Sequence, residues 1–126
     1  VIMKILAVDD EEDMQTLFMQ RFRNEIRSGV MEFYFASSAP QALEVLDEHQ
    51  HQFVLILSDI NMPGMSGLEL LSQIKKKYNA PPPKVFMITA YGDDNNYNMA
   101  MSLGADDFIT KPLDFTLLKD KLKNTV

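Results

Sequence analysis

Five consecutive acids, from Asp9 to Asp13, are the first segment of the sequence that could carry chemistry. A further acid, Asp59, directly follows the apolar stretch 53–58, and the chain after it runs into a loop rather than a helix. An unpaired carboxylate at the end of a buried strand is costly to desolvate, so such a residue is more often functional than structural. We therefore take Asp9, Asp10 and Asp59 as candidate functional residues.

The rest of the acidic run has a simpler interpretation. Acidic side chains in the first turn of a helix are stabilised by the helix dipole, by about 0.3–1 kcal/mol each. Glu11, Glu12 and Asp13 directly precede a helical pattern that starts at Met14. We predict that these three residues are ordinary, solvated first-turn residues.

The elements that must position these acids can be read from the pattern of apolar residues. Apolar, β-branched or aromatic runs recur along the chain and predict five strands, at 2–8, 31–36, 53–58, 84–89 and 107–110. Three of them are almost continuously apolar, which is typical of strands covered on both faces. Segments of helical period lie between them, so the chain alternates strand and helix. This alternation predicts an α/β, flavodoxin-like (βα)5 fold: a doubly wound parallel sheet, order 2-1-3-4-5, with helices on both faces.

Capping signals support the helix positions. Ser38 and Ser66 are each followed three residues later by Gln or Glu, as in a capping box, and Asp114 can cap the last helix. Gly29 and Gly104 stand where helices should end. The run 81–83 is Pro-Pro-Pro and predicts a stiff connection into the fourth strand. In the fourth helix the spacing predicts an inward face of Tyr97, Ala100, Met101 and Gly104, with Met99 and Leu103 exposed.

The predicted topology brings the candidate residues together. The carboxyl ends of parallel strands meet at one edge of the sheet, so Asp9 and Asp10 of the first strand should converge with Asp59 of the third. Thr89 and Lys111 end the fourth and fifth strands. Two carboxylates about 4 Å apart repel by roughly 4 kcal/mol at an effective dielectric constant near 20, which favours a bound cation. Oxygen ligands without cysteine suit Mg²⁺.

Composition bounds the remaining possibilities. The chain has 126 residues, with 12 basic and 18 acidic side chains and a formal charge of −6. It has no basic surplus for direct nucleic-acid binding, and no cysteine for disulfides, thiolate metal sites or cysteine nucleophiles. The longest apolar run, 53–57, is too short to cross a membrane, and the start of the chain does not resemble a secretory signal. We expect one soluble, cytoplasmic domain over residues 1–126.

Four segments together resemble the response-regulator receiver domain of two-component signalling. They are ILAVDDEED, LILSDINMPGMSGLELL, VFMITAYGD and GADDFITKPLD, and the resemblance covers essentially the whole chain in order. It implies that Asp59 accepts a phosphoryl group from a phosphohistidine of a sensor histidine kinase or phosphotransfer protein. Such a domain is not an enzyme acting on other molecules, because it catalyses only its own phosphorylation and dephosphorylation.

The resemblance also implies roles for individual residues. Mg²⁺, or Mn²⁺ in its place, would be held by Asp9, Asp10, Asp59 and the backbone carbonyl of Asn61. Thr89 and Lys111 would hold the phosphoryl oxygens, and Phe108 would be the aromatic switch residue. Asn61 and Tyr91 would tune the lifetime of the phosphoryl group, and the bond before Pro112 would be cis. Phosphorylation would change the face made by the fourth helix, fifth strand and last helix, which would contact a second copy or an output module fused in a longer chain.

Two other functions are alternatives to this one. A phosphohydrolase of the haloacid-dehalogenase type also uses an aspartyl nucleophile with Mg²⁺, but its nucleophile is the first Asp of a D-x-D motif after the first strand, where this chain has Asp9-Asp10-Glu11. A degenerate receiver would serve only as a binding surface. The presence of Asp59, Thr89 and Lys111 together argues against it.

Overall fold

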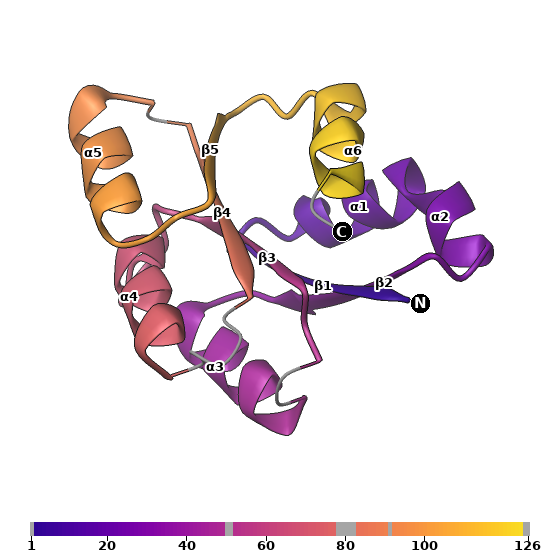
Figure 1. The fold of residues 1–126 in the computed structure, drawn as a ribbon, viewed down its shortest axis with the longest axis horizontal. Coiled ribbons are helices and arrows are strands. Elements are labelled where there is room, and N and C mark those ends of the chain that lie inside the picture. Colours follow the sequence, from indigo (N-terminus) through magenta and orange to yellow (C-terminus); the bar gives the residue numbers. More distant parts are fainter. Residues whose placement is uncertain (1, 50–51, 78–82, 91, 125–126) are drawn as a thin grey trace.

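The structure is a computed structural model and describes residues 2–49, 52–77, 83–90 and 92–124. Its centre is a five-stranded parallel sheet in the order β2-β1-β3-β4-β5 (Figure 1). The strands are β1 (Met3–Val8), β2 (Met31–Ala36), β3 (Leu55–Asp59), β4 (Lys84–Thr89) and β5 (Asp107–Thr110). The predicted fold class and strand order are confirmed. Across the described residues, no helix is both long enough and apolar enough to cross a lipid bilayer.

Register aligns the carboxyl ends of the strands. Val8 of β1 pairs with Ser58 of β3, and the next residue, Asp59, pairs with Ile88 of β4. Thr89 of β4 pairs with Thr110 of β5. The residues that end β1, β3, β4 and β5 therefore lie side by side along one edge of the sheet.

Helices cover both faces of the sheet. In Figure 1, α3, α4 and α5 lie on one side and α1, α2 and α6 on the other. Each side has its own apolar core, one built around residues such as Leu6, Ile56 and Met87, the other around Ile5, Leu57 and Phe86. This division follows from the alternation of side chains along each strand. The helices are α1 (Asp13–Arg21), α2 (Arg23–Arg27), α3 (Ala39–Glu48), α4 (Gly67–Lys77), α5 (Asp94–Ser102) and α6 (Phe115–Lys123).

The predicted first helix is divided in two. Phe22 separates α1 from α2 with φ −105° and ψ 20°, outside the usual helical range. Its ring is nevertheless fully buried and lies 5.8 Å from that of Phe18, centroid to centroid. The helical pattern that starts at Met14 predicted one helix here and did not reveal the break.

The predicted helix ends are confirmed in the described part of the chain. The Ser38 and Ser66 hydroxyls each accept a hydrogen bond at 3.2 Å, from the backbone of Gln41 and of Glu69. The Asp114 carboxylate accepts one from the Leu117 backbone at 3.1 Å. Gly29 and Gly104 have φ of 81° and 99°, as helix-ending glycines require. Of the predicted proline connection, residues 81 and 82 lie outside the described residues.

The predicted faces of the fourth helix, α5, are partly wrong. Ala100 is buried and Met99 is exposed, as expected. Tyr97 and Met101, predicted to point inward, are 47% and 39% exposed. Leu103, predicted to be exposed, packs against the core. Leu103 has helical dihedrals and lies three positions after Ala100, so both residues share one face, and the inward face of α5 is rotated from the predicted one.

Candidate functional site

Asp59 is a buried carboxylate at the end of a buried strand. It is the last residue of β3, whose five residues are all buried because β1 and β4 flank the strand. Its side chain is 7% exposed. One carboxylate oxygen accepts a hydrogen bond from the Asn61 backbone at 3.3 Å. Burial, and then the negative charge of Asp9, raise the pKa of Asp59, while Lys111 acts in the opposite direction.

The three candidate acids do come together. One carboxylate oxygen from each of Asp9, Asp10 and Asp59 can be chosen so that all three lie within 4.8 Å of one another. Asp9 is held in place by the Glu11 backbone, which donates to its carboxylate at 2.9 Å, whereas the side chain of Asp10 is exposed. Three oxygen donors at this spacing, with one side exposed, fit a hard divalent cation that keeps several water ligands.

Lys111 pairs with two of these acids, Asp9 and Asp59, and offsets part of their negative charge. Its ammonium lies 3.1 Å from Asp9, 3.1 Å from Glu11 and 3.3 Å from Asp59. Burial alone would lower the pKa of Lys111, but its hydrogen bonds to Glu11 and Asp9 raise it above the ordinary value for lysine. The Lys111 backbone also donates to the Thr89 carbonyl at 2.8 Å, which fixes the lysine to the end of β4.

The ion pair of Glu11 was not predicted. Helix α1 begins at Asp13 with Glu12 as its N-cap, so only Asp13 is a first-turn residue, and the prediction for Glu11 and Glu12 is wrong. Glu11 remains 63% exposed, but its carboxylate pairs with Lys111, a residue 100 positions along the chain. Spacing within the acidic run gives no signal for such a distant partner.

Thr89 and Asn61 are in direct contact. Thr89 is fully buried at the end of β4, and its hydroxyl accepts a hydrogen bond from the Asn61 side-chain amide at 3.2 Å. Asn61 follows β3 in the loop before α4, so this bond links the loop after Asp59 to the neighbouring strand. Tyr91, the other residue expected to tune lifetime, lies outside the described residues.

Phe108 lies on the edge strand, away from the carboxylates. It is partly buried, and its ring lies 5.4 Å from that of Tyr97 of α5 in an edge-to-face arrangement. The bond between Lys111 and Pro112 is cis. His49 lies at the end of α3 with its ring 4.7 Å from that of Tyr34.

Gly67 is a structural residue of the site that sequence reasoning used only as part of a motif. A Cβ atom at Gly67 would lie 1.9 Å from the backbone oxygen of Asp59. The Gly67 backbone donates to the Ile60 carbonyl at 2.8 Å. Helix α4 therefore starts directly against the backbone of the phosphoacceptor candidate, an approach that only glycine permits.

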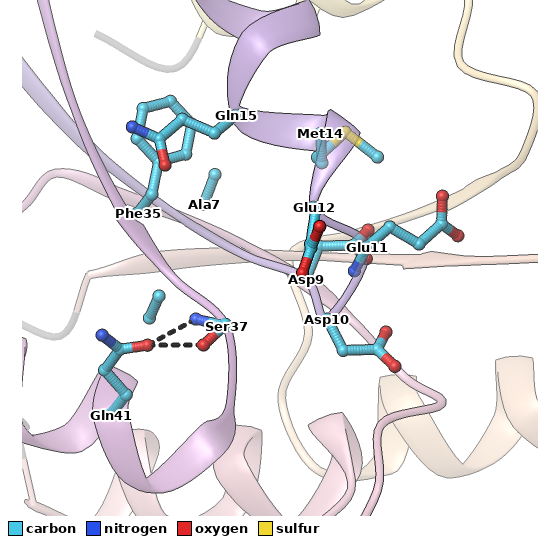
Figure 2. Close-up of a pocket in the computed structure, with 11 residues that line it drawn as sticks. Ala7, Asp9, Asp10, Glu11, Glu12, Met14, Gln15, Phe35, Ser37 and Gln41 are labelled. Carbon is cyan, nitrogen blue, oxygen red and sulfur yellow. Dashed lines mark hydrogen bonds between the residues drawn. The ribbon is translucent and has the colours of Figure 1, made fainter.

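A cavity of about 370 Å³ adjoins the acids. Figure 2 shows the acidic segment on one side of it and Phe35, Ser37 and Gln41 on the other. The Gln41 side-chain oxygen accepts hydrogen bonds from the Ser37 backbone at 2.7 Å and the Ser37 hydroxyl at 2.8 Å. These bonds connect the end of β2 to α3 in that wall of the cavity. The cavity thus lies between the acidic segment after β1 and the residues that end β2 and begin α3.

Comparison with known sequences identifies the family of this chain. The family model described as the response regulator receiver domain matches residues 5–123. The response regulator protein FleR of Pseudomonas aeruginosa is 36% identical over 117 residues, which are 93% of this chain and 23% of FleR. The regulatory protein VanRc of Enterococcus gallinarum is 37% identical over 111 residues, 88% of this chain and 44% of VanRc. The chain therefore spans less than half the length of both relatives.

Solved structures agree. A CheY-like receiver domain protein from Methanospirillum hungatei is 31% identical, with a TM-score of 0.85 over 98% of this chain and 93% of that one. The CheX–CheY–BeF3–Mg²⁺ complex from Borrelia burgdorferi contains a chain that is 27% identical, with a TM-score of 0.84 over 97% of this chain and 87% of that one.

Proposed function

The chain belongs to the response regulator receiver domain family of two-component systems, and on that premise we propose that Asp59 accepts a phosphoryl group from a phosphohistidine of a sensor histidine kinase or phosphotransfer protein. The observation that carries the proposal is the buried Asp59 carboxylate, 3.3 Å from the Lys111 ammonium and beside two further acids. Phosphoryl transfer depends mainly on positioning and on neutralising charge, and these residues supply both.

The acids fit the divalent cation that the family uses. We propose that Asp9, Asp10, Asp59 and the backbone carbonyl of Asn61 hold Mg²⁺, with Mn²⁺ as the alternative ion. When bound, the ion supplies positive charge that neutralises the phosphoryl group and orients it. Asp9, 8% exposed and fixed by the Glu11 backbone, keeps its carboxylate aimed at this position.

The transfer step needs little movement from the chain's own residues. A carboxylate oxygen of Asp59 forms a bond to phosphorus as the bond from phosphorus to the donor's imidazole nitrogen breaks. The electron pair of that bond stays on the nitrogen, which then takes a proton from solvent. Lys111 and the hydroxyl of Thr89 donate hydrogen bonds to the phosphoryl oxygens, and Lys111 stays protonated because its pKa is raised.

Signalling follows from a local change at Thr89. As its hydroxyl turns toward the phosphoryl group, space opens for Phe108 to rotate inward from its contact with Tyr97. This would remodel the α5–β5–α6 face, made by those three elements. The face would then bind a second copy or control an output module of a longer chain, and Asn61 and Tyr91 would set how long the signal lasts. We place this activity in the cytoplasm.

One experiment tests the proposal. The chain is incubated with Mg²⁺ and acetyl phosphate, and its intact mass is measured, with Asp59→Asn as the control. We expect a single, labile phosphoryl adduct on the wild-type chain and none on the variant. An adduct that persists in Asp59→Asn contradicts the proposal, as does rapid turnover of phosphate esters, which would indicate a hydrolase.

A further inference from the structure

The Lys111 ammonium already has three carboxylate partners. An ammonium group has three N–H donors, and contacts with Asp9, Glu11 and Asp59 at 3.1, 3.1 and 3.3 Å account for them. A phosphoryl oxygen that approaches Lys111 while Asp59 is still a free carboxylate must therefore replace one of these partners. Which one it replaces determines what the replacement costs.

The three partners differ in how easily they can leave. The side chains of Asp9 and Asp59 are 8% and 7% exposed, and each also accepts a backbone hydrogen bond, from Glu11 and from Asn61. The Glu11 side chain is 63% exposed. A carboxylate released into water regains its hydration, whereas a buried one does not, so Glu11 is the partner that leaves at the lowest cost.

The position of Glu11 suits such an exchange. It lies in the loop between β1 and α1, so its side chain can move without disturbing a helix or strand. Figure 2 shows this side chain extending away from Phe35 and Gln41, on the far side of the acidic segment. Leaving Lys111 would take the Glu11 carboxylate into solvent and would break no buried interaction.

We propose that Glu11 is a positioning residue that holds the third donor of Lys111 until a phosphoryl oxygen replaces it. This inference rests on the proposed function and deepens it. Glu11 keeps the ammonium oriented beside Asp59 in the resting state. It also competes with the phosphoryl group, so it lowers the affinity of the site for that group.

Glu12 provides a matched control. It is the neighbouring residue, is exposed and carries the same charge, and no ion pair links it to Lys111 among the described residues. Glu11→Gln and Glu12→Gln thus remove equal charge from almost the same place, and only the first removes a partner of Lys111. Glu11→Asp keeps the charge but shortens the side chain by one methylene.

The probe is BeF3⁻, a mimic of the phosphoryl group, at saturating Mg²⁺. Its Kd is measured by NMR titration, alongside the Kd for Mg²⁺ alone. For Glu11→Gln we expect BeF3⁻ to bind about threefold to fivefold more tightly, the upper part of the range for one exposed ion pair. Glu12→Gln should change the Kd by less than about twofold, and Glu11→Asp should resemble Glu11→Gln because it cannot reach Lys111. The Kd for Mg²⁺ should be equal in the two glutamine variants.

The results that would overturn the inference can be told apart from those that would overturn the proposed function. Equal changes in Glu11→Gln and Glu12→Gln, or none in either, would mean that the contact has no effect beyond general charge and would overturn the inference. Weaker binding of both BeF3⁻ and Mg²⁺ in Glu11→Gln would assign Glu11 to the metal site and overturn it too. In each case a wild-type chain that still forms the acetyl phosphate adduct leaves the proposed function standing. A wild-type chain that forms no adduct and binds no BeF3⁻ overturns both.

Discussion

The side-chain amide of Asn61 donates a hydrogen bond to the hydroxyl of Thr89 at 3.2 Å. This bond joins the loop that follows Asp59, the proposed phosphoacceptor, to the strand that ends at Thr89, the proposed switch residue. It holds the Thr89 oxygen in the resting position, so the hydroxyl has to turn against it to reach a phosphoryl group.

Removing the hydrogen bond between Asn61 and Thr89 should make it easier for the Thr89 hydroxyl to turn toward a phosphoryl group. We expect Asn61→Ala to bind BeF3⁻ about twofold to fivefold more tightly, because a hydrogen bond of about 1 kcal/mol no longer opposes the movement of Thr89. The backbone carbonyl of residue 61 is unchanged, so Mg²⁺ should bind as before. NMR titration measures both, with the remote, exposed Asn24→Ala as control. Weaker BeF3⁻ binding would mean that the Asn61 amide supports the phosphoryl group instead.

Thr89 should couple phosphorylation to the α5–β5–α6 face. Thr89→Ala removes the hydroxyl that draws the strand end inward, so we expect it to bind BeF3⁻ and yet not shift the NMR signals of Phe108 and Tyr97. Thr89→Ser keeps the hydroxyl and should retain the shift. A full shift in Thr89→Ala would show that the signal reaches Phe108 by another route.

The contact between Gly67 and the Asp59 backbone should be the least tolerant of substitution. A Cβ in Gly67→Ala would meet the Asp59 carbonyl at 1.9 Å, so α4 or the end of β3 has to move. We expect a loss of about 2–3 kcal/mol in the free energy of unfolding, measured with urea. Gly29→Ala is the control: φ is 81° there but the space is open, and the cost should be about 1 kcal/mol. A loss in Gly67→Ala no larger than that in Gly29→Ala would mean that α4 or the end of β3 moves away from the added Cβ at little cost.

Asp59 should make the folded chain less stable at neutral pH when no Mg²⁺ is present. Its pKa is raised above the ordinary value of 3.8 by burial and by Asp9. The folded state therefore binds this proton more tightly than the unfolded state, and stability falls as pH rises through 3.8 toward the raised value. The penalty is complete once the pH is above the raised pKa.

Asp59→Asn should remove that penalty. In EDTA at pH 7 we expect the variant to unfold with a free energy about 1 kcal/mol higher than wild type. The gain should fade as the pH falls to about 4. Urea unfolding across this range tests the sign, with the exposed Asp10→Asn as control. A less stable Asp59→Asn would mean that pairing with Lys111 outweighs burial.

Met99 tests the proposed contact surface. It is 52% exposed on α5, whereas Leu103 packs against the core. Met99→Glu should leave the Tm within about 2 °C of wild type. Leu103→Glu should lower the free energy of unfolding by more than about 2 kcal/mol, because it buries a charge. If BeF3⁻ promotes self-association of the wild type, sedimentation should show that Met99→Glu weakens it. Unchanged association would exclude Met99 from the interface.

Sequence pattern was sufficient for features that depend on one element and its neighbour. Alternating apolar runs predicted the strand order, and the ends of those runs placed Asp9, Asp10, Asp59, Thr89 and Lys111 together. Sequence pattern was not sufficient where contacts between distant parts of the fold determine the conformation. The break at Phe22 leaves the apolar period unchanged, and the packing of α5 on the sheet turns Leu103 inward in place of Tyr97 and Met101.

Contacts between distant segments were the other failure. The pair of Glu11 and Lys111 joins residues 100 positions apart, and no local spacing encodes it. The resemblance to a family predicted which residues gather at the sheet edge, but it did not predict which of them touch in the resting state. The bond between Asn61 and Thr89 belongs to the same class.

The place of β3 in the sheet has a consequence for how often each part of the molecule opens. β3 is buried along its whole length between β1 and β4, whereas the four residues of β5 are only partly covered at the edge. Amide hydrogen exchange should therefore be slowest around Asp59 and much faster around Phe108. If Asp59 is phosphorylated as proposed, the modified residue would lie in a segment that seldom unfolds, and the α5–β5–α6 face could fluctuate without unfolding the strand end that holds the phosphoryl group.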